Sequence, residues 1–238
     1  MQYVLALLVL ILFTITLVRL LVLRLSVNHL KTYWLNQNQK QPVQNELIYV
    51  VLGDSTAQGV GATYPIFSYP SLIAKWLQKQ TARPVRVINL SVTGANAKDV
   101  FTQQIPQMYR IGPPHIVTVC IGANNVKNFH AEQFESEMKS IVMALPRESY
   151  VANVVSFTGL HSAKDWKAVQ AGDLVRRCVS TTNHHFVDLH TETASNKSLL
   201  RHFAADMFHP NARAYKKWAI AFEKAMAERI PELIQLKK

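Results

Sequence analysis

The feature that most constrains the fold is an alternation of short apolar runs with longer segments of helical periodicity. The runs are rich in β-branched residues and occupy 47–52, 85–92, 115–121, 150–157 and 185–190. The helical segments occupy 69–80, 97–110, 131–145, 163–180 and 211–230. This alternation is typical of a parallel sheet with helices on both faces, and nearly continuous apolar strands fit burial on both sides. We therefore predict an α/β fold with five parallel strands.

The N-terminus is a long apolar run. Arg19 is the only charged residue between Tyr3 and Leu23, and as a helix this run would reach about 30 Å, the thickness of a bilayer core. It lacks the basic start and the small residues of a signal-peptide cleavage site. A buried core helix is the alternative, but few soluble helices are apolar on every face. We predict an uncleaved transmembrane anchor over 1–24, a polar tether over 25–46 and a folded domain over 47–238.

The charge distribution bears on orientation and on partners. The formal net charge is +11, and the first 40 residues contain four basic residues and no acidic one. By the positive-inside rule, bases on the C-terminal flank of the span favour a domain that faces the cytoplasm, although a single span leaves a periplasmic or extracellular placement open. Basic and aromatic residues do not interleave as in nucleic-acid-binding proteins, so we predict no nucleic-acid partner. The oligomeric state is left open.

Composition excludes several protein classes. With 49% hydrophobic residues and two cysteines, the chain is neither intrinsically disordered nor a disulfide scaffold. Cys120 and Cys178 lie in apolar patterns and are expected to be buried small residues. The segment HHFVDLH at 184–190 offers possible metal ligands, but its alternation favours a strand. We predict no metal site.

Polar residues follow the predicted strands. They are Gly53-Asp54-Ser55 after the first, Ser91-Val92-Thr93-Gly94 after the second, Gly122-Ala123-Asn124-Asn125 after the third, and Asp206-Met207-Phe208-His209 in the last loop. Each group alone is compatible with a turn or a helix cap. In open parallel sheets, however, the carboxyl ends of the strands line the ligand crevice. Together the groups supply a hydroxyl, an imidazole, a carboxylate and amide donors, which are the components of acyl-transfer catalysis.

The last group has local chemistry of its own. Pro210 biases His209 away from helical backbone, so the imidazole is presented from an extended loop. Asp206, three residues earlier, can reach the ring from the same loop. A carboxylate bonded to one ring nitrogen fixes the tautomer and leaves the other nitrogen free to act as a base.

These four ordered blocks resemble the SGNH, or GDSL, hydrolases, most closely in LGDSTAQGVGA and FHPNARAYKKWA. The resemblance covers about residues 47–230 and implies a three-layer α/β/α sandwich of flavodoxin-like type. It implies that Ser55 is the nucleophile, His209 the base and Asp206 its orienting acid. The backbone N–H groups of Ser55 and Gly94 and the side-chain amide of Asn124 would form the oxyanion hole.

The resemblance also has limits. The family's third block usually reads G-x-N-D, and Asn125 stands in place of that aspartate. A membrane-anchored serine hydrolase of lipid, short-acyl or acetylated-glycan esters, without metal or organic cofactor, is the reading that the residues favour. An acyltransferase with the same site and a non-catalytic membrane-tethered binding module are the alternatives. A nucleotide-binding flavodoxin relative is disfavoured, because the chain lacks both G-x-x-x-x-G-K-[ST] and G-x-G-x-x-G.

Overall fold

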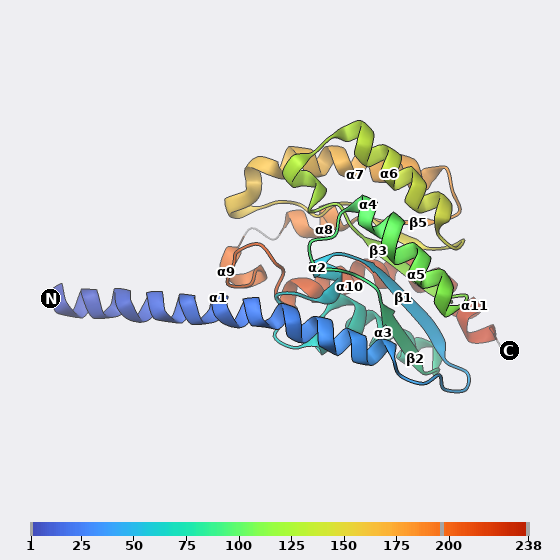
Figure 1. Ribbon diagram of the computed structural model, residues 1–238, viewed down its shortest axis with the longest axis horizontal. Coiled ribbons are helices and arrows are strands. Elements are labelled where there is room, and N and C mark those ends of the chain that lie inside the picture. Colours follow the sequence, from blue (N-terminus) through green and yellow to red (C-terminus); the bar gives the residue numbers. More distant parts are fainter. Residues whose placement is uncertain (1, 196–197, 237–238) are drawn as a thin grey trace.

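The computed structural model describes residues 2–195 and 198–236, and within them a single five-stranded parallel sheet (Figure 1). Its strands are β1 (Leu47–Gly53), β2 (Val85–Asn89), β3 (Ile116–Cys120), β4 (Tyr150–Ala152) and β5 (His185–Val187). The strand order is β2-β1-β3-β4-β5. The order therefore reverses beside β1, and in open α/β sheets ligands bind at such a switch point, outside the carboxyl ends of the strands.

Helices cover both faces of the sheet and make the three layers. One face carries α3 (Tyr69–Thr81), α10 (Ala212–Met226) and α11 (Ile230–Gln235); the other carries α4 (Ala97–Asp99), α5 (Ile105–Ile111), α6 (Ala131–Ala144) and α7 (Asp165–Ser180). Alternate residues of β1 point to opposite layers: Tyr49 and Val51 pack with α3 and α10, and Val50 and Leu52 with α5 and α6. The predicted α/β/α sandwich is confirmed.

The strands end earlier than the sequence predicts. The apolar runs continue to 92, 121, 157 and 190, but the strands end at residues 89, 120, 152 and 187. The residues beyond include Leu90, Val154 and Phe157, which pack into the core as loop rather than strand. At this carboxyl edge the chain forms three short helices, α2 (Ser55–Gln58), α8 (Leu189–Ala194) and α9 (Leu199–His202).

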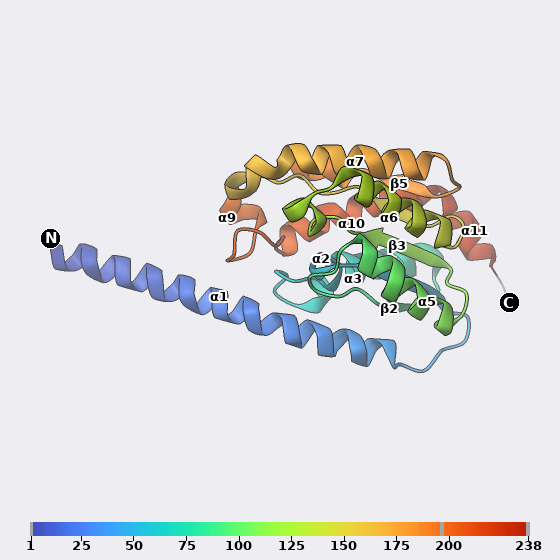
Figure 2. The same ribbon diagram turned by 45° about the horizontal axis from the view of Figure 1, so that its top comes forward.

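Helix α1 runs without interruption from Gln2 to Asn38 (Figures 1 and 2). Its N-terminal half projects away from the sheet, is exposed throughout and is long and apolar enough to cross a membrane. Its C-terminal half packs along β2, where Leu30 and Trp34 are 2% and 3% exposed. The stretch 25–46, predicted as a polar tether, is therefore helical up to Asn38 and docked on the domain. Leu30 and Trp34 lie one helical turn apart, and this spacing places both on the buried face.

Candidate active site

Ser55 is the first residue of α2, directly after β1. The side chain of Asp54 caps this helix by accepting from Thr56 N at 2.9 Å and from Thr56 Oγ1 at 2.7 Å. Ser55 is only 6% exposed, and its Oγ lies 3.0 Å from Nε2 of His209. The backbone N–H of Ser55 lies in the first turn, where N–H groups have no acceptor within the helix. The nucleophile and one predicted oxyanion donor therefore share a fixed position.

The last loop brings the base and the acid to the same place. Nδ1 of His209 lies 2.5 Å from Oδ2 of Asp206, while Oδ1 of Asp206 accepts from the backbone N–H groups of Phe208 at 3.1 Å and His209 at 3.0 Å. Burial alone would raise the pKa of Asp206, but the hydrogen bonds from His209 and Phe208 outweigh it and lower the pKa. The carboxylate stays ionised and orients the imidazole, leaving Nε2 directed at Ser55.

A second carboxyl beneath the nucleophile behaves in the opposite way. Asp54 is 2% exposed, and desolvation raises its pKa although Thr56 donates two hydrogen bonds to it. Its two bonds to Thr56 hold the turn that presents Ser55. The geometry gives Asp54 a structural position and leaves the contact with His209 to Asp206.

The other two predicted oxyanion donors lie on neighbouring loops. Gly94 has φ +84°, and a Cβ at this position would meet no atom within 4 Å, so the backbone conformation requires glycine and the space above it is open. Asn124 Nδ2 donates to the carbonyl of Ala95 at 2.8 Å. This bond uses one of its two amide hydrogens and joins the Asn124 loop to the Gly94 loop.

Asn125, the departure from the family pattern, also joins these loops. Its Oδ1 accepts from Ala97 N at 3.1 Å, at the start of α4, and its Nδ2 donates to Oε2 of Glu137 at 3.4 Å. An aspartate would also accept from Ala97, but it would place a carboxylate against Glu137. The amide at this position therefore suits its neighbour on α6.

Buried amides that sequence reasoning missed hold the loops in place. Gln104 accepts from Gly53 N and donates to Gly53 O, both at 2.8 Å, and so fixes the end of β1. Gln58 donates to Ser91 O at 2.8 Å and accepts from Thr93 Oγ1 at 2.6 Å, which links α2 to the loop of Gly94. The sequence could have indicated that Gln104 is buried, because it lies one helical turn after the apolar Val100 and on the same face.

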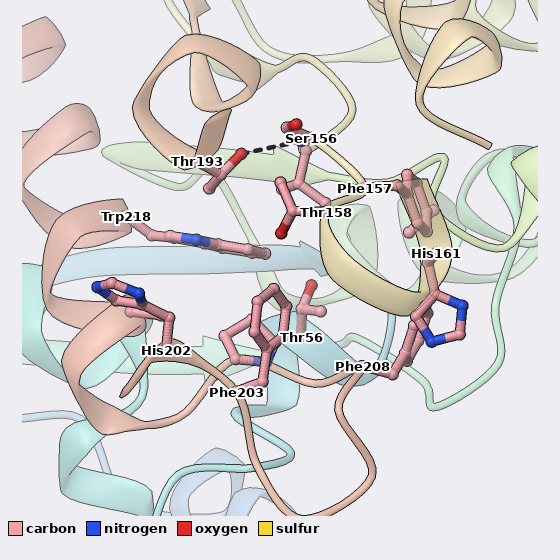
Figure 3. Close-up of a pocket in the computed structure, with 14 residues that line it drawn as sticks. Thr56, Ser156, Phe157, Thr158, His161, Thr193, His202, Phe203, Phe208 and Trp218 are labelled. Atoms are coloured by element: carbon pink, nitrogen blue, oxygen red, sulfur yellow. Dashed lines mark hydrogen bonds between the residues drawn. The ribbon is translucent and has the colours of Figure 1, made fainter. Parts of the chain in front are cut away.

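A mainly apolar cavity of about 40 Å³ borders the site (Figure 3). Its lining includes Thr56, which follows Ser55, and Phe208, which precedes His209. Trp218, Phe203 and Phe157 supply most of its large apolar surface. The cavity is therefore lined by the sequence neighbours of the two residues whose side chains carry the predicted reaction.

Within residues 2–195 and 198–236, no three His, Cys, Asp or Glu side chains gather as metal ligands would. In the segment HHFVDLH, residues 185–187 form β5, as the alternation predicts.

Comparison with known proteins identifies the family. Residues 51–217 match the model of the GDSL-like lipase/acylhydrolase family. A GDSL-like esterase of Mycobacterium tuberculosis is 32% identical over 91 residues, which cover 38% of this chain and 29% of that protein. The chain thus aligns with less than a third of the length of this curated relative.

Solved structures share the fold. A variant of an acetyl xylan esterase from Geobacillus stearothermophilus superposes with a TM-score of 0.63 at 19% identity, covering 76% of this chain and 94% of that one. A family 3 carbohydrate esterase of Clostridium thermocellum gives 0.64 at 15% identity, covering 79% and 99%. At 19% and 15% identity, these matches show a shared fold. With a family model that covers most of its length and the fold of SGNH esterases, the chain belongs to the GDSL-like lipase/acylhydrolase family.

Proposed function

We propose that this protein is a membrane-anchored serine hydrolase that cleaves carboxylic esters through an acyl-enzyme. One observation carries the proposal: Ser55 Oγ, the His209 ring and the Asp206 carboxylate form a continuous relay with contacts of 3.0 and 2.5 Å. Asp206 and His209 lie 151 and 154 positions after Ser55 in the sequence. They meet it only because the first and last loops share one edge of the sheet.

The mechanism follows from this relay. His209 Nε2 takes the proton of Ser55 as Oγ attacks the ester carbonyl, and the proton then passes to the leaving alcohol. Water repeats the sequence and releases the acyl group. The N–H groups of Ser55 and Gly94 and the amide of Asn124 are proposed to stabilise the oxyanion, and the loss of one such donor typically lowers turnover about 100- to 1,000-fold.

The cavity beside the relay favours a short acyl group. Because about 10–15 Å³ of such volume holds one water, 40 Å³ has room for only a few heavy atoms. One structural neighbour, solved as wild type and as a variant, is an acetyl xylan esterase by name, which agrees with this size. We therefore expect acetyl and other short acyl esters to be better substrates than long-chain esters.

The N-terminal half of α1 is proposed to span the membrane once. Its apolar side chains are exposed, and the helix continues unbroken into the segment docked on the domain. The basic C-terminal flank predicts that the domain faces the cytoplasm. A cysteine added at the C-terminus should resist an impermeant thiol reagent in intact cells, and labelling there would overturn the orientation. A mature protein that begins beyond residue 24 would overturn the anchor itself.

An ester panel of graded acyl length tests the proposed activity. We expect turnover of short esters by the full chain and none by Ser55→Ala, while Ser140→Ala, at a half-buried serine on α6 away from the site, should match wild type. Adding sugar or lipid alcohols separates hydrolysis from acyl transfer, because a transferase would yield a new ester in place of free acid. A folded wild-type protein that cleaves no ester would contradict the proposal.

A further inference from the structure

A groove lies between α1 and the rim of the catalytic edge. It has a volume of about 560 Å³, with α1 on one side. The other side is formed by the loop 61–63, by residues 201–205 at and after the end of α9, and by residues 211–213 at the start of α10. The α1 side chains that line it are Val18, Arg19, Val22, Leu23 and Ser26. This spacing places them on one face of the helix. The groove therefore begins within the last turn and a half of the proposed membrane span.

The position of α1 relative to the domain is fixed by buried contacts. Trp34 Nε1 donates to Gln58 O at 2.8 Å, in the same short helix that begins with Ser55. Asn38 makes two bonds of 2.8 Å with the backbone of Asn89, on the edge strand β2. In both ribbon views α2 and α9 lie toward the end of the domain from which the N-terminal half of α1 projects (Figures 1 and 2). The catalytic edge is thus directed toward the membrane that α1 would enter.

The charged residues that line the groove are all basic. Arg19, Arg201 and Arg213 line it, and no acidic residue does so among the described residues. The three arginines form no ion pair within the described part of the chain. The pKa of His202 is lowered mainly by desolvation, and the charges of Lys217, Arg201 and Arg213 lower it further. These positive charges therefore lie close together at this rim. Between them lie apolar walls that include Val22 and Leu23.

A phospholipid headgroup matches this combination. Arg19 lies about 6 Å along the helix axis from the end of the span at Leu23, which is the depth of the headgroup boundary. Guanidinium groups bind phosphate oxygens in bidentate geometry, and apolar walls beside them accommodate the start of the acyl chains. The cytoplasmic leaflet, which the proposed orientation places next to the groove, carries the anionic lipids.

We propose that this groove binds the phosphate of an anionic membrane phospholipid through Arg19, Arg201 and Arg213. The inference rests on the proposed membrane anchoring. The groove wall packs against the loop that carries the base. A Cβ at Gly61 would be 2.3 Å from Pro210 O and 3.0 Å from His209 Cβ, and Ala204 N donates to His209 O at 2.8 Å. A bound lipid holds the rim that carries His209 against the bilayer surface, where membrane-embedded esters are presented.

The test compares two double variants of the full chain. Arg201→Gln/Arg213→Gln removes two charges from the groove and leaves Arg19 in the span. Arg110→Gln/Arg147→Gln removes two exposed charges from other parts of the surface, on α5 and in the loop before β4. Each protein is purified in neutral detergent and titrated with phosphatidylglycerol or phosphatidylcholine, and the bound lipid is counted by native mass spectrometry.

We expect wild type and the control to retain phosphatidylglycerol in preference to phosphatidylcholine. The groove variant should bind phosphatidylglycerol about 30-fold more weakly, since a basic residue at an anionic surface contributes about fivefold. Equal binding by all three proteins would overturn the inference. Inorganic phosphate that displaces the lipid at similar concentration would show that the ligand is free phosphate, which also contradicts it.

A second readout separates this inference from the proposed activity. All three proteins should react equally with a fluorophosphonate and cleave a water-soluble acetyl ester at the same rate, because the variants leave Ser55, His209 and Asp206 in place. If no protein reacts, the proposed hydrolase fails while the lipid titration still decides the groove. If all react and lipid binding is unchanged by the groove variant, the groove fails and the hydrolase stands.

Discussion

The two loops that carry the catalytic relay are built differently. The first, at residues 53–59, is part of the core: Asp54, Ser55, Thr56 and Gln58 are between 2% and 7% exposed, and Gln104 binds both backbone groups of Gly53. The last, at residues 203–210, is half-buried and is held mainly by hydrogen bonds within the loop. Asp206, for example, accepts from the backbone N–H groups of Phe208 and His209.

The nucleophile and the base are therefore held in place by different parts of the molecule. The nucleophile is fixed by the sheet, by Gln104 in the helical turn before α5 and, through Trp34, by α1. The base is fixed by a local turn in which Met207 adopts φ +53°, a conformation that L-residues rarely take. Changes around Ser55 should therefore affect stability as well as catalysis. Changes in the last loop should affect mainly the geometry of the imidazole.

The largest effect is expected where the two loops meet. Ser55→Ala and His209→Ala should each lower kcat for a short ester about 10⁵- to 10⁶-fold, because nucleophile and base act as a unit. For the same reason, the double variant should be no slower than either single one. Steady-state kinetics measure this, and effects that multiply in the double variant would show that the two residues do not work together.

Asp206→Asn is expected to give the next largest effect. An asparagine can still contact the ring but does not stabilise the imidazolium or fix the productive tautomer, so kcat should fall about 10⁴-fold. The melting temperature should change little compared with Ser140→Ala, because the loop keeps its other bonds. A variant that unfolds would show that the last loop, like the first, is part of the structural core.

Trp34→Phe tests the support that the first loop receives from α1. It leaves the carbonyl of Gln58 without its donor, which should cost about 1–3 kcal/mol. For a chain of this size, that lowers the melting temperature in detergent by about 2–12 °C. Trp166→Phe, at a tryptophan 62% exposed on α7, is the matched control. Equal melting of the two variants would indicate that α1 does not stabilise the nucleophile loop.

Asp54→Asn should have the smallest effect, and the size of this effect depends on pH. Because burial raises the pKa of Asp54 in the folded protein, the protonated form stabilises the fold below the unfolded pKa of about 3.9, and this contribution is lost as pH rises through the folded pKa. Asparagine keeps an acceptor for Thr56 without a charge. The variant should melt about 2–4 °C higher than wild type at neutral pH.

At acidic pH, where Asp54 is protonated in both states, the difference should disappear. Thermal unfolding at several pH values measures it. A variant that is less stable at neutral pH would show that the ionised carboxylate is needed in the first loop.

Sequence reasoning reached the fold and the places of the site residues because both depend on local patterns. Strand β1 begins at Leu47 and helix α6 at Ala131, where the periodicity predicts them. The ends of the strands were predicted too late, because Val154 and Phe157 are apolar for packing and not for pairing. Periodicity does not separate these two causes of apolar character.

What the sequence did not indicate depends on partners far along the chain. Asn38 belongs to a polar stretch that resembles a tether, and its two bonds to Asn89 exist only because α1 lies along β2. Gln58 likewise reads as a residue after a turn, although it joins Trp34 to the loop of Gly94. Such amide contacts leave no periodic signal, so they become visible only in the structure.

The most direct measurement of the central claim is the mass of the full chain after reaction with a fluorophosphonate, followed by mapping of the modified peptide. The relay predicts one added phosphonyl group on Ser55 in wild type, none in Ser55→Ala, and much slower labelling in His209→Ala. Stoichiometric modification at another serine, or undiminished labelling of Ser55→Ala, would contradict the account.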